Sequence, residues 1–261
     1  MDLNLKGARA LVTGASQGIG LACATVLAAE GVNLLIAARR GPELESVAED
    51  LLTRYGVDVQ WKAIDLSASG SAEALAQWAA DGVDILVNNA GAIPTGELLE
   101  LDEETWRRAW DLKVFGYINL TRAIYREMKR RKKGVVVNII GSAAEQPSAG
   151  YIAGASANAS LAAFTRGLAS AAPWDGVRVV GIHPGPTQTE RYIGILQAQA
   201  QERFGDASRY DELMSELPFA RACKPEEIAN AVAFFASDRS AYTNGSILMI
   251  DGGFSLSRGR Y

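Results

Sequence analysis

Short apolar runs alternate with longer amphipathic segments along the whole chain. The runs are five to eight residues long and rich in Val, Ile, Leu and Ala, which is typical of strands buried on both faces of a parallel sheet. This alternation predicts an α/β fold of the Rossmann type, with a doubly wound, seven-stranded parallel sheet and helices on both of its faces. The predicted strands cover residues 8–12, 32–38, 57–64, 83–87, 135–140, 177–183 and 246–250.

The segments between these runs have helical patterns. Apolar Trp106, Trp110 and Val114 recur at steps of four, so we predict one long helix over residues 103–131. The other predicted helices cover residues 21–30, 42–55, 71–80 and 149–172.

One segment, residues 190–217, interrupts the alternation. It leaves the carboxyl end of a predicted strand, and ligands bind at such ends in open α/β sheets. We therefore predict a substrate lid here, within a single domain that spans residues 1–261. The alternative is an ordinary pair of surface helices.

Composition narrows the classes of function. The net charge is −4, and the basic cluster at 129–133 ends a predicted helix, where the helix dipole favours cations, so nucleic-acid binding has little support. No apolar run approaches the length of about 18 residues that a membrane span needs. Cys23 and Cys223 are far apart, and with one histidine they form no metal-ligand pattern. We expect a cytoplasmic protein without a metal or a membrane anchor.

The segment that follows the first predicted strand has the strongest chemical signal. It reads Thr13-Gly14-Ala15-Ser16-Gln17-Gly18-Ile19-Gly20 and leads directly into a helical pattern. Glycines allow a tight turn and a close approach of the backbone to an anion, while the start of the helix offers unpaired N–H groups. This arrangement predicts a phosphate cradle.

Four later motifs follow predicted strands in the order Asp65-Leu66, Asn88-Asn89-Ala90-Gly91, Pro184-Gly185-Pro186-Thr187-Gln188-Thr189 and Asp251-Gly252-Gly253. With the T-G-x-x-x-G-x-G spacing, they resemble the short-chain dehydrogenase/reductase family through nearly the whole chain. The resemblance implies a dinucleotide cofactor that is held by Gly14, Ser16, Gln17, Gly18, Ile19, Gly20, Arg39, Arg40, Asp65, Leu66, Asn89, Ala90, Gly91, Asn158, Pro184, Gly185, Thr187 and Thr189.

The end of the second predicted strand bears on which cofactor binds. A carboxylate there would hydrogen-bond the ribose of NAD, but the chain has Ala38 followed by Arg39 and Arg40. A guanidinium can clamp a 2′-phosphate, which favours NADP(H) over NAD(H). Neutral Gln17, where many NADP-dependent relatives have a basic residue, weakens this interpretation.

The resemblance fails at the catalytic positions. The family uses a tyrosine and a lysine four residues apart on one helix, with a serine and an asparagine nearby. An ungapped alignment, counted back from Pro184 by about thirty residues, places these four positions at Gly154, Asn158, Gly141 and Lys113. All four family residues are therefore replaced. In a rival alignment with a three-residue insertion, Tyr151 is the family tyrosine and Ala155 takes the place of the lysine.

Four nearby residues could form a rearranged site. Ser142 and Tyr151 would bind or protonate the substrate oxygen, with Tyr151 one turn before Gly154 on the same helical face. Lys113 would tune the phenol or carry a water, and Asn158 would hydrogen-bond the nicotinamide ribose. The alternatives are that Tyr151 closes a loop, that Ser142 caps a turn and that Lys113 faces solvent.

Three functions remain open from the sequence. The first is an NADP(H)-dependent oxidoreductase that acts on the carbonyl or secondary alcohol of a small molecule, with Arg191 and Tyr192 of the lid near the substrate. The second is a lyase, isomerase or dehydratase that keeps the nucleotide for structure or uses it transiently, and the third is a regulatory protein that binds NADP(H) without turnover. The resemblance also implies a homo-oligomer, a tetramer or a dimer.

Overall fold

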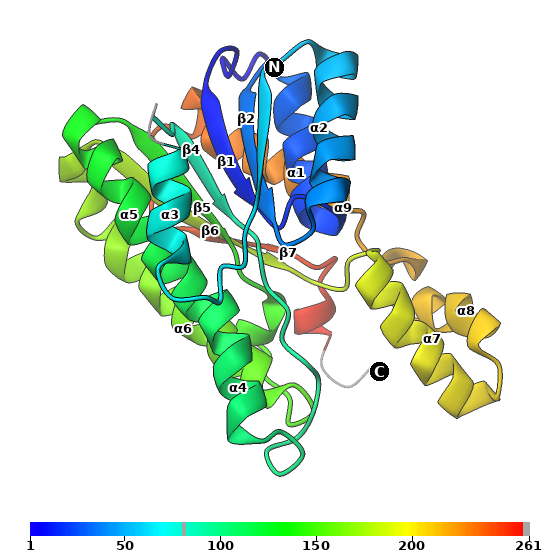
Figure 1. Cartoon of the computed structure of the whole chain (residues 1–261). Coiled ribbons are helices and arrows are strands. Elements are labelled where there is room, and N and C mark those ends of the chain that lie inside the picture. Colours follow the sequence, from blue (N-terminus) through cyan, green and yellow to red (C-terminus); the bar gives the residue numbers. More distant parts are fainter. Residues whose placement is uncertain (80–81, 258–261) are drawn as a thin grey trace.

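Seven parallel strands form one sheet in the computed structural model, which describes residues 1–79 and 82–257. The strand order is β3-β2-β1-β4-β5-β6-β7, so the predicted fold class is confirmed (Figure 1). The order reverses between β1 and β4, where open α/β sheets form a ligand-binding crevice. The strands are β1 (Arg9–Thr13), β2 (Asn33–Ala38), β3 (Val59–Ala63), β4 (Ile85–Asn88), β5 (Gly134–Ile139), β6 (Val177–Pro184) and β7 (Ile247–Ile250).

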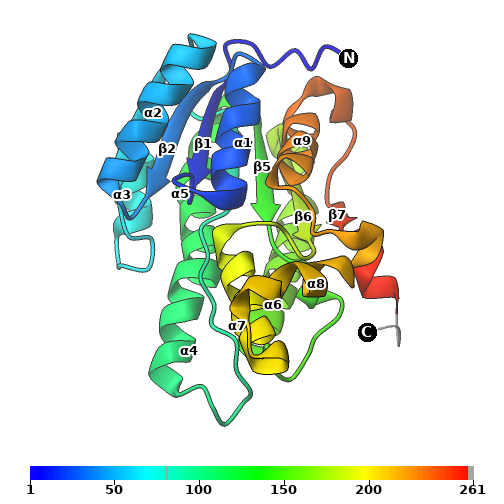
Figure 2. The same cartoon turned by 90° about the vertical axis from the view of Figure 1, so that its right-hand side faces the viewer.

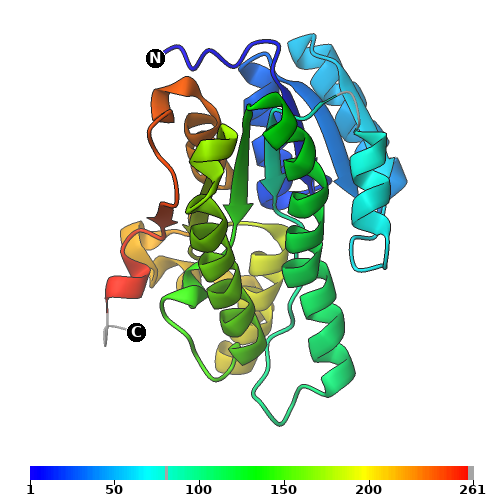
Figure 3. The same ribbon diagram turned by 90° about the vertical axis from the view of Figure 1, so that its left-hand side faces the viewer.

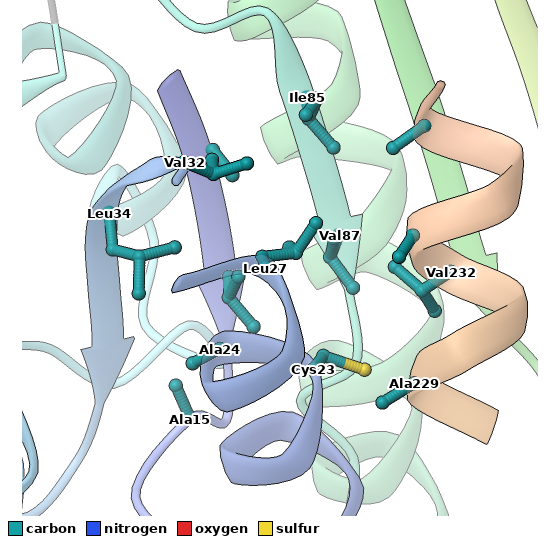
Figure 4. Close-up of a cluster of buried hydrophobic side chains, with 14 of the residues drawn as sticks. Ala15, Cys23, Ala24, Leu27, Val32, Leu34, Ile85, Val87, Ala229 and Val232 are labelled. Carbon is teal, nitrogen blue, oxygen red and sulfur yellow. The ribbon is translucent and has the colours of Figure 1, made fainter. Parts of the chain in front are cut away.

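Helices cover both faces of the sheet, as the apolar character of its central strands requires. One face packs against α1 (Gly18–Ala29), α2 (Gly41–Tyr55) and α9 (Pro225–Ala236) (Figure 2). The other face packs against α3 (Ser71–Trp78), α5 (Gly116–Arg131) and α6 (Ile152–Ala169) (Figure 3). Figure 4 shows the first core, in which Cys23 and Leu27 of α1 meet Val232 of α9 beneath strand β4. Burial raises the pKa of the Cys23 thiol to about 12, so this thiol serves packing.

The predicted helix over 103–131 is not regular in its middle. It consists of α4 (Glu103–Trp110), a π-helical turn (Asp111–Phe115) and α5. The wider turn rotates the two halves relative to each other, so Trp106 and Trp110 pack beside Ile93 while Leu120 packs on the sheet. The predicted bounds, 103–131, are confirmed, and only the π-helical turn was not predicted, because apolar spacing does not reveal one extra residue in a turn.

One other predicted element differs from the structure in a way that matters for the site. Helix α6 begins at Ile152 rather than at residue 149, and Tyr151 is its N-cap residue, with φ −139° and ψ 35°. The insert at 190–217 contains α7 (Glu190–Phe204) and α8 (Tyr210–Ser215), which share their own apolar cluster beyond the carboxyl ends of the strands (Figure 1). Residue 80, the predicted end of the helix at 71–80, lies outside the described residues. Within the described ranges, no helix combines the length and apolar character that crossing a bilayer requires.

Candidate active site

A cleft of about 610 Å³ opens at the carboxyl ends of the strands. It brings together residues from the segments that follow all seven strands and from helix α7. All but two of the predicted site residues line it: Gly14, Ser16, Gln17, Gly18, Ile19, Arg39, Arg40, Leu66, Asn89, Ala90, Gly91, Lys113, Ser142, Tyr151, Asn158, Pro184, Gly185, Thr187, Thr189, Arg191 and Tyr192. The two exceptions are Gly20 and Asp65.

The glycine loop has the geometry of an anion cradle. Gly14 has a positive φ of 66°, and a Cβ built on it would lie 2.8 Å from Nδ2 of Asn89. A Cβ on Gly20 would lie 2.2 Å from the carbonyl oxygen of Gly14, so Gly20 packs under the loop instead of lining the cleft. Gln17, the N-cap residue of α1, makes no side-chain capping bond, which leaves the first amides of the helix available to a phosphate. The loop therefore fits the pyrophosphate of a dinucleotide.

Thr13 holds this loop against the loop that follows β4, a role that the sequence did not suggest. Its Oγ1 accepts hydrogen bonds from the amides of Asn89 (3.0 Å) and Ala90 (3.1 Å), while Nδ2 of Asn89 donates to the carbonyl of Thr13 at 2.9 Å. The side chain of Asn89 is thereby occupied in joining the two loops.

At the other end of the glycine loop, Arg40 donates a hydrogen bond to Oε1 of Gln17 and pairs with Glu43 at 2.9 Å. Asp65 lies beyond the cleft wall, and its Oδ1 accepts hydrogen bonds from the amide (2.9 Å) and hydroxyl (2.7 Å) of Ser67. The Ser67 amide and the nearby charge of Arg39 hold the pKa of Asp65 below its ordinary value. The cleft itself is thus lined by basic residues at this end, as a 2′-phosphate requires.

Tyr151 lies at the opposite end of the cleft. Its backbone is non-helical because it is the N-cap residue of α6, and its ring crosses Gly154, three residues further along the chain. A Cβ on Gly154 would lie 2.0 Å from Cζ of Tyr151. Burial raises the pKa of the Tyr151 hydroxyl, and the Arg191 guanidinium beside it opposes the shift. The phenol is therefore protonated at neutral pH.

Lys113 points inward from the π-helical turn instead of facing solvent. Its Nζ donates to the carbonyls of Ile139 (3.1 Å) and Ile140 (2.8 Å), at the carboxyl end of β5. Burial, together with the charge of Arg191, lowers the pKa of Lys113 to about 7. Lys113 can therefore exchange a proton near neutral pH.

Asn158 and Ser142 complete the wall between these groups. A Cβ on Gly141, which has a φ of 139°, would lie 2.5 Å from Nδ2 of Asn158, so the amide occupies space that a side chain at position 141 would need. Asn158 is buried, and its Oδ1 has no hydrogen-bond partner within the described part of the chain. This orphaned acceptor, in a residue that lines the cleft, fits a ligand hydroxyl.

Several lining residues escaped the sequence analysis. They are mostly apolar and lie outside the quoted motifs: Ala37, Ile64, Ala92, Thr95, Leu112, Ile139, Ile140, Ala143, Ile195 and Phe254. Ala38, Gly141 and Pro186 also line the cleft, although the sequence analysis gave them no ligand contact. Some could have been found, since Phe254 and Ala92 directly follow motifs at strand ends. His183 is buried at the end of β6, with Nε2 3.6 Å from Oε1 of Glu145, and is not among the lining residues.

A doubly wound sheet with an anion cradle at its topological switch point defines a dinucleotide-binding α/β protein. A family profile described as "Enoyl-(Acyl carrier protein) reductase" matches residues 14–255. The chain belongs to the short-chain dehydrogenase/reductase family, so the resemblance inferred from its motifs is confirmed, and it is an oxidoreductase of that family.

Similar proteins cover the chain almost completely. The uncharacterized oxidoreductase YvaG of Bacillus subtilis is 33% identical over 98% of this chain and 99% of its own length. The 3-oxoacyl-[acyl-carrier-protein] reductase FabG of Vibrio cholerae is 33% identical over 97% of this chain and 100% of its own. The L-sorbose reductase of Gluconobacter frateurii, solved in complex with NADPH and L-sorbose, has a TM-score of 0.93 and 32% identity, over 98% of this chain and 100% of that one.

Proposed function

We propose that this chain uses NADP(H) to reduce a carbonyl group of a small molecule, or to oxidise the corresponding secondary alcohol, with a rearranged set of proton-handling residues. The observation that carries the proposal is that one cleft joins the anion cradle, the basic end and the cluster around Tyr151. The similar L-sorbose reductase, whose structure contains NADPH, supports the choice of cofactor.

The residues of the cleft fit the cofactor in three places. The amides that open α1 would hold its pyrophosphate, and Arg39 and Arg40 would hold a 2′-phosphate. Oδ1 of Asn158 would accept a hydrogen bond from a ribose hydroxyl. When bound, NADP(H) supplies or accepts the hydride.

Tyr151 and Ser142 would act on the substrate oxygen. In the direction of reduction, the Tyr151 hydroxyl donates its proton to that oxygen while the Ser142 hydroxyl donates a hydrogen bond to it. A phenol whose pKa is raised by burial is in the proton-donating form at neutral pH. Arg191, whose charge opposes that shift, stabilises the phenolate that forms.

Lys113 would replace the lost proton. With its pKa lowered to about 7 by burial and by Arg191, its amine alternates between charged and neutral forms under physiological conditions. Lys113 thus takes over, from a different helix, the cationic role that the family assigns to the position of Asn158.

Helices α7 and α8 would form the lid over this site, as part of the single domain. Arg191, Tyr192 and Ile195 of α7 already line the cleft, which supports a role of the lid in substrate binding. We also propose that the protein forms a homo-oligomer, a tetramer or a dimer, with which half-exposed Phe115 on the outer surface is consistent. We propose a cytoplasmic location as well, with which the free thiols of Cys23 and Cys223 are consistent.

The test combines nucleotide binding with turnover. Calorimetry with NADPH and NADH should show uptake with a preference for NADPH, and a panel of ketones and aldehydes should then deplete reduced-nicotinamide absorbance. The reverse reaction is tested with NADP⁺ and a panel of alcohols. Nucleotide uptake without turnover on either panel would favour the regulatory alternative. Substrate conversion without a net change in nicotinamide absorbance would favour a lyase, isomerase or dehydratase. Absence of nucleotide uptake would contradict all three.

A further inference from the structure

The charged side chains that line the cleft are all cationic. Among the lining residues of the described ranges, they are Arg39, Arg40, Lys113 and Arg191, with no aspartate or glutamate. The chain as a whole contains 30 acidic and 26 basic residues, so composition does not explain this bias. A cleft with fixed charges of one sign favours ligands of the opposite sign.

The four cations fall into two separate pairs. Arg39 and Arg40 follow β2, whereas Lys113 contacts the end of β5, and strands β1 and β4 lie between these two in the sheet. The first pair is accounted for by the 2′-phosphate of the proposed cofactor. The second pair, Lys113 and Arg191, is beside Tyr151, where the substrate oxygen must lie.

Arg191 has donor capacity to spare in this position. It stands in the first turn of α7, which Thr189 caps by accepting a hydrogen bond from the amide of Tyr192 at 3.2 Å. Its Nη2 donates to the carbonyl of buried Ile93, which fixes the guanidinium at the wall of the cleft. The guanidinium also hydrogen-bonds Tyr151, which opposes the rise in the pKa of that phenol caused by burial. Within residues 1–79 and 82–257 no carboxylate forms an ion pair with Arg191, so its remaining N–H groups can serve a ligand.

The two cations of this pair destabilise each other. The charge of Arg191 contributes to the lowered pKa of Lys113, and it also acts on the Tyr151 hydroxyl, so the three groups form one electrostatic cluster. Lys113 satisfies two of its N–H groups with neutral carbonyls rather than with an anion. An anionic ligand would relieve this repulsion.

We propose that the substrate carries a carboxylate in addition to the carbonyl or hydroxyl group that reacts, and that Arg191 binds this carboxylate through its remaining N–H groups, with Lys113 as a second cation beside it. The inference rests on the proposed oxidoreductase function. The planar guanidinium fork matches a carboxylate. The cleft lining also includes Ala92 and Thr95, which flank Ile93 closely in the sequence, and Tyr192 and Ile195 of α7. These residues offer apolar contact for a short aliphatic or aromatic body and add no further charge.

The test compares matched ligands on the protein loaded with NADP⁺, in which ketones bind without turnover. The probes are 2-oxobutanoate, 4-oxopentanoate, 5-oxohexanoate and 4-acetylbenzoate, which differ in the distance from the carbonyl group to the carboxylate. Each acid is compared with its methyl ester, which has no charge. Calorimetry should show that at least one acid binds tenfold or more tightly than its ester. Arg191→Gln should remove that preference while changing NADP⁺ affinity less than twofold, and Arg191→Lys should retain part of it. Arg203→Gln is the matched control, since Arg203 lies on the same helix in an exposed ion pair with Glu216.

Each other outcome overturns a defined claim. If every ester binds as tightly as its acid, or if the preference survives Arg191→Gln, the assignment of a carboxylate is wrong. If Arg191→Gln weakens NADP⁺ and the acids by the same factor, Arg191 holds the cofactor's pyrophosphate instead. If the unmodified protein takes up no nucleotide, the proposed function itself fails, which is a distinct result.

Proton uptake provides an independent readout for Lys113. A carboxylate beside its amine favours the charged form, so binding at pH 8 should take up a fraction of a proton, measured as a difference in binding enthalpy between Tris and HEPES buffers. Tyr117, His183, Tyr151 and Arg191 also face this region, so the comparison is made with Lys113→Met, which should lose the uptake. Equal uptake in both proteins, or none in either, would overturn the placement of the carboxylate beside Lys113.

Discussion

The ring of Tyr151 occupies the space that a side chain at Gly154 would need, since a Cβ on Gly154 would lie 2.0 Å from Cζ of the tyrosine. The same relationship holds between Asn158 and Gly141, where the corresponding distance to Nδ2 is 2.5 Å. In the ungapped alignment, Gly154 and Gly141 take the positions of the family's tyrosine and serine. Under that alignment, the absence of those side chains and the placement of Tyr151 and Asn158 would be two aspects of one rearrangement.

A double-mutant cycle tests this relationship between Tyr151 and Gly154. Alanine normally stabilises a helix interior over glycine by about 1 kcal/mol, but in Gly154→Ala the new methyl group must displace the ring. In a Tyr151→Ala background the clash is absent, and the same substitution should raise the free energy of unfolding by about 0.5–1 kcal/mol. Urea denaturation of the four proteins measures the coupling. Equal effects of Gly154→Ala in both backgrounds would show that the ring does not lie where the structure places it.

The proposed proton donor can be tested by removing one oxygen atom. Tyr151→Phe keeps the ring over Gly154 but cannot donate a proton, so we expect turnover to fall by about 10²-fold or more with little change in nucleotide affinity. Tyr242→Phe is a matched control because Tyr242 is fully exposed and does not line the cleft. An unchanged rate for Tyr151→Phe would remove Tyr151 from the mechanism.

The lowered pKa of Lys113 predicts a pH dependence of stability. Between about 7, its pKa in the folded protein, and its ordinary value of 10.5, the unfolded chain binds a proton that the folded protein does not. The free energy of unfolding should therefore rise with pH in this window, by at most about 1.4 kcal/mol per pH unit for one proton. Arg191, Tyr117 and His183 face the same region, so the measurement is the difference between the original protein and Lys113→Met. Urea denaturation at pH 6.5, 8 and 9.5 should give a shallower slope for the variant, and identical slopes would contradict a buried, neutral amine.

The sequence predicted the sheet and most of the cleft because both depend on local patterns. Buried parallel strands require continuous apolar runs, and the motifs after them, such as Asn89-Ala90-Gly91, all reach the same edge of the sheet. Two residues that were predicted to line the cleft, Gly20 and Asp65, do not line it. Both are adjacent in sequence to lining residues, and only their packing turns them away from the cleft.

The catalytic end was less predictable because it depends on the direction of side chains. Nothing in the apolar spacing distinguishes the π-helical turn that directs Lys113 to the carbonyls of Ile139 and Ile140. The non-helical backbone of Tyr151 likewise depends on the turn that precedes α6 rather than on helical periodicity. The spacing of residues in the sequence predicted that Lys113 and Tyr151 lie in one site, but it did not predict the directions of their side chains.

The basic end of the cleft predicts how the nucleotides are distinguished. Arg39→Ala should weaken NADPH binding by tenfold or more and leave NADH nearly unchanged, because only NADPH carries the 2′-phosphate. Glu43→Gln should have the opposite effect, since Glu43 pairs with Arg40 at 2.9 Å and competes with the phosphate for its charge. Calorimetric titration with both nucleotides measures the ratio of affinities. Equal losses of NADPH and NADH in Arg39→Ala would end the assignment of NADP(H).

The anion cradle can be tested with two glycines that share a backbone conformation but differ in location. Gly18 in the cradle has a φ of 57°, and a Cβ on it would lie 3.2 Å from Cγ2 of Thr189, whereas Gly56 at the end of α2 has a φ of 67° and no atom within 4 Å of such a Cβ. Alanine in the left-handed conformation costs roughly 1 kcal/mol, so both Gly18→Ala and Gly56→Ala should lower the free energy of unfolding by a similar amount. Only Gly18→Ala places a methyl group at the entrance to α1, where the pyrophosphate would rest, and it should weaken NADPH binding by tenfold or more. Calorimetry and urea denaturation of both variants separate the two effects. Full nucleotide affinity in Gly18→Ala would show that the phosphate does not approach the start of this helix.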